Sequence, residues 1–400
     1  MKMEAFPMRM IRMFRCFRLL MSVVLFVLLT GVPVRAIELP PIPELPGETA
    51  EENELGPSTE SQPERALATG EFLELCKNGS PEEIRSAIER GSDVNAGDNK
   101  GMTPMMCAVR HNKNPDVLGV LLKAGADLEA KEHKHGLTAL YFASWNENPE
   151  VLSALLKAGA DFEARDNYGT TVLMHTVSVN ENPVVLALLL TAGADLKAKD
   201  TNASNALMYA AGSNENPDMV VALLKAGADL KAKDENGWSA LMYAAALNEN
   251  PKMVAALLKA GADIKEKDNF GNTALMNAAR RNENPDVVLT LLKAGADLKA
   301  KDKYGETVLM KAAEFNENPE MIGALLKAGA DIKAKDTAGE TALMHAAQWN
   351  KNPDVVLALL KAGADPKVKD KNGKRAIDYA QENEKLKASP VFTILRNASK

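Results

Sequence analysis

The chain has 400 residues with 48 basic and 54 acidic side chains, which gives a formal net charge of −6. Residues 1–36 carry a net charge of +5, so residues 37–400 carry −11. Such an acidic chain offers no electrostatic reason to bind nucleic acid or an anionic membrane surface. Only Cys76 and Cys107 follow the N-terminal segment, which excludes a disulfide framework. We expect two buried thiols in neighbouring helices.

Residues 1–36 have the order of a secretory signal peptide. Five basic residues precede an apolar run over residues 19–29, and a small-residue site ends at Ala36. A membrane-spanning helix needs about 20 apolar residues, so cleavage after Ala36 is favoured over an uncleaved anchor. No cysteine follows the run at the place that a lipoprotein anchor requires. The protein is therefore expected to be exported, to the periplasm or out of the cell, and to attach to a membrane only if this segment stays uncleaved.

Residues 37–65 read as a disordered linker. Six prolines and eight glutamates crowd this segment, which has few bulky apolar side chains. It cannot bury enough surface to offset the entropy of ordering. A solvated spacer is the expected role, and a proline-motif ligand is the alternative.

From residue 66 the chain repeats every 34 residues. Nine glycines keep this spacing: Gly91, Gly125, Gly159, Gly193, Gly227, Gly261, Gly295, Gly329 and Gly363. Nine prolines keep it too: Pro81, Pro115, Pro149, Pro183, Pro217, Pro251, Pro285, Pro319 and Pro353. A fixed period of this length predicts a solenoid of stacked units.

Each unit predicts two short helices and a loop. In a typical unit Thr273 is placed as the N-cap of the first helix, and Asn282 is placed to end it in the left-handed conformation. Asn284 and Pro285 then begin the second helix as N-cap and first helical residue. Gly295 supplies the C-terminal stop, and a short polar hairpin-like loop leads to the next unit.

These units resemble the ankyrin-repeat family across residues 66–398. The resemblance rests on the opening Asp-x-x-Gly-x-Thr-x-Leu, the Ala-Ala pair and the closing Leu-Leu-x-x-Gly-Ala-Asp. It implies an all-α solenoid, a stack of helix pairs with hairpin-like loops, in about ten units including a cap at each end. Tetratricopeptide repeats share the 34-residue period but place their aromatic residues and prolines elsewhere.

Several positions depart from the family pattern. The turn between the two helices reads Asn-Glu-Asn-Pro, one residue longer than usual. Ala203 stands where other units have the loop glycine, so that loop is expected to be strained. The third unit gains a residue around residues 133–135 and loses one near Trp145, which predicts a bulged loop. The units that begin near Leu67 and Ala376 read as the two caps.

A row of methionines stands where the family usually has histidine. Its members are Met106, Met174, Met208, Met242, Met276, Met310 and Met344. A soft-metal site is one interpretation, but each Met follows a core position of the first helix, so a buried seam is favoured.

No catalytic or cofactor-binding motif is found in the sequence. His133 and His135 could contribute two metal ligands, yet further ligands are not visible and a solvated loop is favoured. We expect neither an enzyme nor a cofactor, and no small-molecule substrate.

The positions that vary between units point to a protein-binding surface. In ankyrin-repeat proteins the loops and the ends of the first helices line a concave groove that holds the partner. The resemblance places these residues there: Arg110, His111, Trp145, Tyr168, Trp238, Leu247, Phe270, Arg280, Arg281, Tyr304, Phe315, Gln348 and Trp349. Aromatic residues and Arg dominate binding energy at interfaces, and all three tryptophans fall in this set. The predicted function is non-catalytic binding of a protein partner; the alternative is a structural, self-associating scaffold of the cell envelope.

Overall fold

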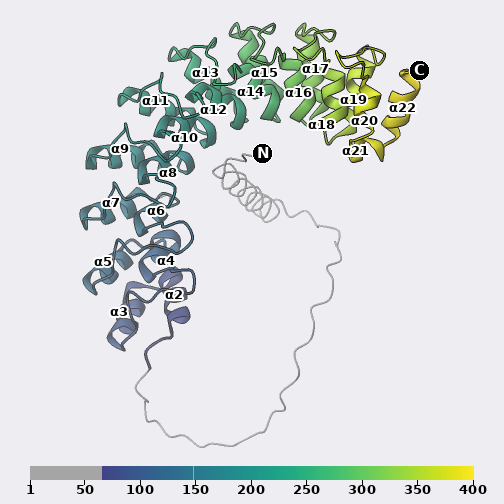
Figure 1. The fold of residues 1–400 in the computed structure, drawn as a ribbon. Helices are drawn as coiled ribbons and strands as arrows, with labels where there is room; N and C mark the ends of the chain where they lie inside the picture. The colour runs from purple at the N-terminus through teal and green to yellow at the C-terminus, as the bar shows by residue number, and fades with distance from the viewer. Residues whose placement is uncertain (1–64, 147) are drawn as a thin grey trace, which may run out of the picture. The chain divides into compact units, whose positions relative to one another are not determined.

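The computed structural model describes residues 65–146 and 148–400, and Arg65–Lys400 form one compact unit. Figure 1 shows this unit as a curved stack of helix pairs. The predicted signal peptide and almost all of the predicted linker lie outside the described residues. None of the helices in the described part of the chain is both long and apolar enough to span a bilayer.

The described residues form 21 helices and no strand, which confirms the all-α solenoid. The first helices of the repeats are α2 (Thr69–Asn78), α4 (Pro104–His111), α6 (Ala139–Ala143), α8 (Val172–Val179), α10 (Ala206–Ser213), α12 (Ala240–Leu247), α14 (Ala274–Arg281), α16 (Val308–Phe315), α18 (Ala342–Trp349) and α20 (Ala376–Ala380). The second helices are α3 (Pro81–Glu89), α5 (Asp116–Lys123), α7 (Pro149–Lys157), α9 (Pro183–Ala192), α11 (Pro217–Lys225), α13 (Pro251–Lys259), α15 (Pro285–Lys293), α17 (Pro319–Lys327), α19 (Pro353–Lys361) and α22 (Pro390–Ala398). One short helix, α21 (Glu384–Lys387), lies in the last connection.

The predicted helix starts and the glycine stop of the repeat are confirmed. The Thr273 hydroxyl accepts a hydrogen bond from the Met276 amide at the start of α14. Asn284 caps α15, in which Pro285 is the first residue. Gly295 has φ +92°, the left-handed conformation that a residue without Cβ adopts at no steric cost.

The prediction that Asn282 adopts the left-handed conformation is wrong. Its backbone is extended, with φ −81° and ψ 133°, and its side chain is buried. The amide Nδ2 donates to the carbonyl oxygens of Ala245 and Asn248 in the preceding repeat, while Oδ1 accepts from the Asn284 amide. Asn282 therefore ends its helix through its side chain, and not by a reversal of its backbone.

The same bonds recur along the stack and form what we call the asparagine ladder. In each of its members, a side-chain amide at the end of a first helix, or three residues beyond it in Asn383, donates to two carbonyl groups of the repeat before. The members are Asn112, Asn180, Asn214, Asn248, Asn282, Asn316, Asn350 and Asn383.

The methionine row is a buried seam. All seven of its side chains have a relative exposure of 1% or less. They pack in one continuous hydrophobic core with the paired alanines of the first helices and the apolar face of the second helices. Unbranched, polarizable Met fills such irregular internal space well, so the row has a packing role.

Two departures from the repeat pattern have the predicted structural effect. Ala203 has φ +62°, and no other non-glycine residue in residues 65–146 and 148–400 has a positive φ. That conformation costs an L-residue about 1–2 kcal/mol. In the third repeat the loop is closed by a hydrogen bond from the Glu132 amide to the Leu137 carbonyl, five residues later. In the next repeat the equivalent bond, from the Asp166 amide to the Thr170 carbonyl, spans only four residues. The loop therefore carries the expected extra residue.

The two cysteines of the described residues lie in neighbouring first helices, Cys76 in α2 and Cys107 in α4. Cys76 and Cys107 are free and buried, as predicted. Burial raises the pKa of Cys76 to about 12 and that of Cys107 to about 11, so both remain protonated and unreactive at neutral pH.

The asparagine ladder predicts a large cost for Asn282→Ala. The substitution leaves two buried carbonyl groups without their donor, and we expect it to lower the free energy of unfolding by about 3 kcal/mol. Asn269→Ala is the matched control, because exposed Asn269 makes one side-chain bond, to the Glu235 carbonyl. It should cost about 0.5 kcal/mol or less. Urea unfolding followed by circular dichroism measures both, and equal shifts would contradict the role of the ladder.

Candidate partner-binding surface

The first helices lie on the inner side of the curve and the second helices on the outer side (Figure 1). Eight of the ten inner helices are preceded by a loop that an aspartate organises. In the loop before α16, Asp302 Oδ1 accepts hydrogen bonds from the amides of Tyr304 and Glu306. Eight loops are closed in this way, by Asp98, Asp166, Asp200, Asp234, Asp268, Asp302, Asp336 and Asp370.

The second carboxylate oxygen of the loop aspartate contacts the side chain nine residues on, within the first helix. Six repeats show this contact, made by Tyr209, Tyr243, Asn277, Lys311, His345 and Tyr379. We call these side chains the position-nine row. Phenol, amide, ammonium and imidazole groups all contact the equivalent carboxylate, so the chemistry of the row changes along the array.

Sequence reasoning did not identify the position-nine row as part of the surface. A signal was present, because most of these residues directly follow a member of the methionine row and vary where the methionine does not. The predicted surface included only residues of loops and helix ends.

The structure places the predicted binding residues in two groups. Five are exposed: His111, Phe270, Tyr304, Phe315 and Trp349. The others are half-buried: Arg110, Trp145, Tyr168, Trp238, Leu247, Arg280, Arg281 and Gln348. Leu247, Arg281, Phe315 and Trp349 are the last residues of successive first helices, each directly before a member of the asparagine ladder.

Cation–π contacts join several of these residues. The Arg280 guanidinium lies 3.9 Å from the centre of the Phe315 ring in the next repeat. Arg281 lies 5.2 Å from the Trp238 ring, which also meets Tyr243 edge-on at 5.4 Å. These contacts stabilise the observed positions of the aromatic rings and arginines in the middle of the array.

Trp145 is placed differently. Its ring packs edge-on against buried His175 at 4.4 Å and lies beside Phe142 at 5.6 Å. Arg110 covers it at 5.4 Å. Trp145 is therefore half-buried among these side chains and presents less surface than Trp349, which is 58% exposed.

Charged side chains concentrate between α16 and α18. Lys311 is 7% exposed and forms ion pairs with Asp302, at 2.7 Å, and with Glu306. Burial alone lowers the pKa of Lys311, but hydrogen bonds to these two carboxylates outweigh it and raise the pKa above its ordinary value. Burial raises the pKa of Glu306.

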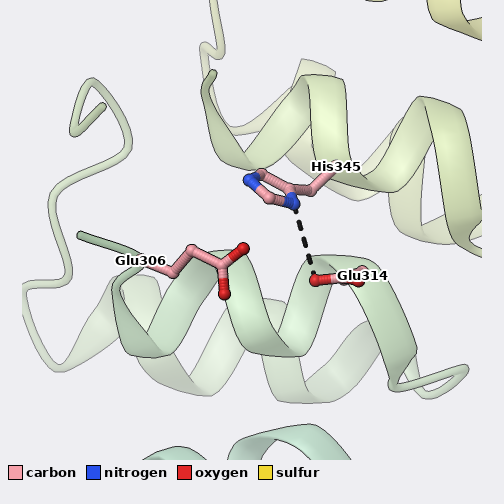
Figure 2. Close-up of side chains that lie close together, drawn as sticks. All are labelled: Glu306, Glu314 and His345. Carbon is pink, nitrogen blue, oxygen red and sulfur yellow. Dashed lines mark ion pairs between the residues drawn. The ribbon is translucent and has the colours of Figure 1, made fainter. Parts of the chain in front are cut away.

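His345 lies among four carboxylates and is 4% exposed. Its Nδ1 is 3.5 Å from Glu314 Oε2, the pair joined in Figure 2. Its Nε2 is 3.2 Å from Asp336 Oδ2 and 3.8 Å from Glu340 Oε2. Burial alone lowers the pKa of His345, but Asp336 and Glu314, with further help from Glu306, raise it to about 9.

His175 occupies the equivalent position in an earlier repeat without such neighbours. Its Nδ1 lies 2.8 Å from Ser144 Oγ, and burial lowers its pKa to about 4. His133 and His135 belong to no cluster of three metal-binding side chains in the described residues. His133 Nδ1 faces the Asn99 carbonyl, and the His135 ring lies 6.2 Å from the Tyr168 ring.

Comparison with protein families agrees with this geometry. A family model described as ankyrin repeats (3 copies) matches seven overlapping stretches that together run from residue 72 to residue 391. The chain belongs to the ankyrin-repeat family. Ankyrin repeats are protein–protein interaction modules, so the ankyrin-repeat array indicates a protein partner. No curated protein matches the chain.

The pKa values of the two buried histidines, His175 and His345, should lie on opposite sides of the ordinary histidine value of 6.5. We expect NMR of the histidine rings, recorded with EDTA present, to show His345 losing its proton near pH 9 and His175 staying neutral down to about pH 4. Because the folded-state pKa of His345 lies above its ordinary 6.5, its contribution to stability is complete below pH 6.5 and is lost as the pH rises through 9. The loss amounts to about 3 kcal/mol.

His345→Gln is the control for this assignment. The variant should lack the high-pH transition and should show no corresponding fall in unfolding midpoint between pH 6.5 and 9.5. A wild-type His345 that titrates near 6.5 would show that the carboxylates do not act on the ring as their distances indicate.

Proposed function

We propose that this ankyrin-repeat protein is exported and binds a protein partner, without catalysis, through the inner surface of its C-terminal repeats. The observation that carries the proposal is the placement of exposed apolar side chains. Six large ones are exposed in the described residues, and four are aromatic: Phe270 at 50%, Tyr304 at 57%, Phe315 at 43% and Trp349 at 58%. These four lie in three successive repeats, in loops or at the ends of first helices, whereas Val184 and Ile394 lie on α9 and α22.

The neighbouring charges support the same surface. Arg280 and Arg281 at the end of α14 are followed in the next two repeats by Glu306, Glu314 and Glu340. Apolar rings bordered by both signs of charge suit a partner that inserts apolar anchors and pairs its own charges around them. The helix pairs hold this surface in place, so binding with little rearrangement of the backbone is expected.

Combined replacement of Phe270, Arg280, Tyr304, Phe315 and Trp349 by Ala should abolish partner capture and leave helicity unchanged. The loss follows because the variant removes the exposed rings and the Arg that supports Phe315. Crosslinking and affinity capture from the native envelope fraction, with mass spectrometry of the bound protein, measure it.

Val184→Ala/Ile394→Ala is the matched control, since it removes exposed apolar side chains from helices outside the surface. It should capture the partner as the wild type does. Undiminished capture by the five-residue variant would exclude the surface. If light scattering instead shows the array assembling with itself through these residues, the self-associating scaffold replaces the binding protein.

Export is tested separately on residues 1–36, whose basic, apolar and small-residue order supports it. We expect the mature protein to begin at Ile37. Mass spectrometry of the N-terminus of the natively expressed protein checks this, with Ala36→Lys as the variant that should block processing at this site. A mature protein that retains Met1 in the membrane fraction would favour an uncleaved anchor.

A further inference from the structure

Between α16 and α18, two carboxylates and one imidazole lie close together on the inner surface. One ligand atom from each of Glu306, Glu314 and His345 lies within 4.8 Å of the others, and Figure 2 shows both carboxylates on the same side of the imidazole. Glu306 precedes α16, Glu314 lies near its end, and His345 comes from the next first helix. Stacking of two repeats thus assembles one carboxylate–imidazole group.

The buried imidazole nitrogen that faces these carboxylates makes no hydrogen bond. His345 Nδ1 is buried without a hydrogen-bond partner, although Glu314 Oε2 lies 3.5 Å away. A charge-assisted hydrogen bond would bring the two atoms to about 2.7–2.9 Å. Two ligand atoms of a tetrahedral Zn²⁺ lie about 3.3 Å apart, given metal–ligand bonds of about 2.0–2.2 Å. The observed 3.5 Å between His345 Nδ1 and Glu314 Oε2 is closer to the distance between two ligands of one ion than to the length of a charge-assisted hydrogen bond.

The other ring nitrogen, Nε2, contacts a carboxylate, as the second ring nitrogen of metal-binding histidines usually does. Nε2 faces Asp336 Oδ2 at 3.2 Å, and Asp336 is itself held by the amides of Ala338 and Glu340. A carboxylate that accepts the Nε2 proton leaves the lone pair on Nδ1 and orients the ring. Once Nδ1 has lost its proton, its lone pair faces Glu314 Oε2, 3.5 Å away, and Glu306 belongs to the same group.

We propose that Glu306, Glu314 and His345 Nδ1 bind a divalent transition-metal ion, best matched by Zn²⁺, with Asp336 as the carboxylate that orients His345. One imidazole and two carboxylates are a donor set that Zn²⁺ accepts, and three protein ligands leave a fourth position open. The side chains of Glu306 and Glu314 are 14% and 15% exposed, so that position is reachable from the inner surface. Lys311 keeps its ion pair with Asp302 when Glu306 turns to the metal.

The test uses the full chain, stripped with EDTA and titrated with ZnCl₂ by isothermal calorimetry. We expect one equivalent of Zn²⁺ to bind. Glu314→Gln and His345→Gln should each weaken binding at least tenfold, and Asp336→Asn should weaken it about 10–100-fold. Co²⁺ in place of Zn²⁺ should give the visible absorption of a tetrahedral site, and that signal should be lost in Glu314→Gln.

Two controls keep the assignment falsifiable. His133→Asn/His135→Asn removes the loop histidines and should bind Zn²⁺ as the wild type does, and unchanged circular dichroism of Glu314→Gln excludes loss of fold. Three outcomes overturn the proposal: no Zn²⁺ binding by the wild type, because a proton keeps Nδ1; loss of binding in the loop variant; or loss in Glu340→Gln with retention in Glu314→Gln, which places the ion at Nε2. None of these readouts involves the protein partner.

Discussion

The asparagine ladder is the constraint on which the rest of the structure depends. Each member satisfies two carbonyl groups of the preceding repeat and one amide of its own turn, as Asn282 does for Ala245, Asn248 and Asn284. Buried backbone groups are costly to leave unpaired, so the register between repeats is set by these bonds as much as by apolar packing. For every member but Asn383, the residue directly before the Asn is the last residue of a first helix. Phe315 and Trp349 are therefore brought to equivalent places on the inner surface of successive repeats.

The loop aspartates allow the side chain nine residues later to vary while the loop conformation stays the same. One oxygen of each carboxylate is used by two loop amides, and the other accepts or pairs with any donor that the position-nine row offers. Tyr209, Asn277, Lys311 and His345 meet this requirement with neutral or cationic groups and without change in the fold. Their environments then differ according to the neighbouring repeats, since His175 faces Ser144 whereas His345 faces Glu314. Because the two carboxylate oxygens have separate partners, repeats with the same backbone can carry chemically different side chains in the position-nine row.

Much of the fold was predictable because it depends on local patterns. The 34-residue period, the Thr and Asn N-caps, the glycine stops and the methionine seam all follow from propensity and burial within one unit. The prediction for Asn282 failed because an Asn at a helix end is, in isolation, best explained by the left-handed conformation. Its actual partners lie 34 and 37 residues away, and no local pattern indicates them.

The sequence by itself determined the repeat, the family, the caps and the positions at which the units differ. Only the tertiary structure decided what those differing residues do. Trp145 and Trp349 fall in the same predicted set, yet one packs on His175 and the other is exposed. The group around His345 joins residues 5, 9, 31 and 39 positions apart from it. The physical reason is that the ligating atoms come from two repeats, so their distances are set by the stacking of helices and by side-chain direction, which spacing along the chain does not specify.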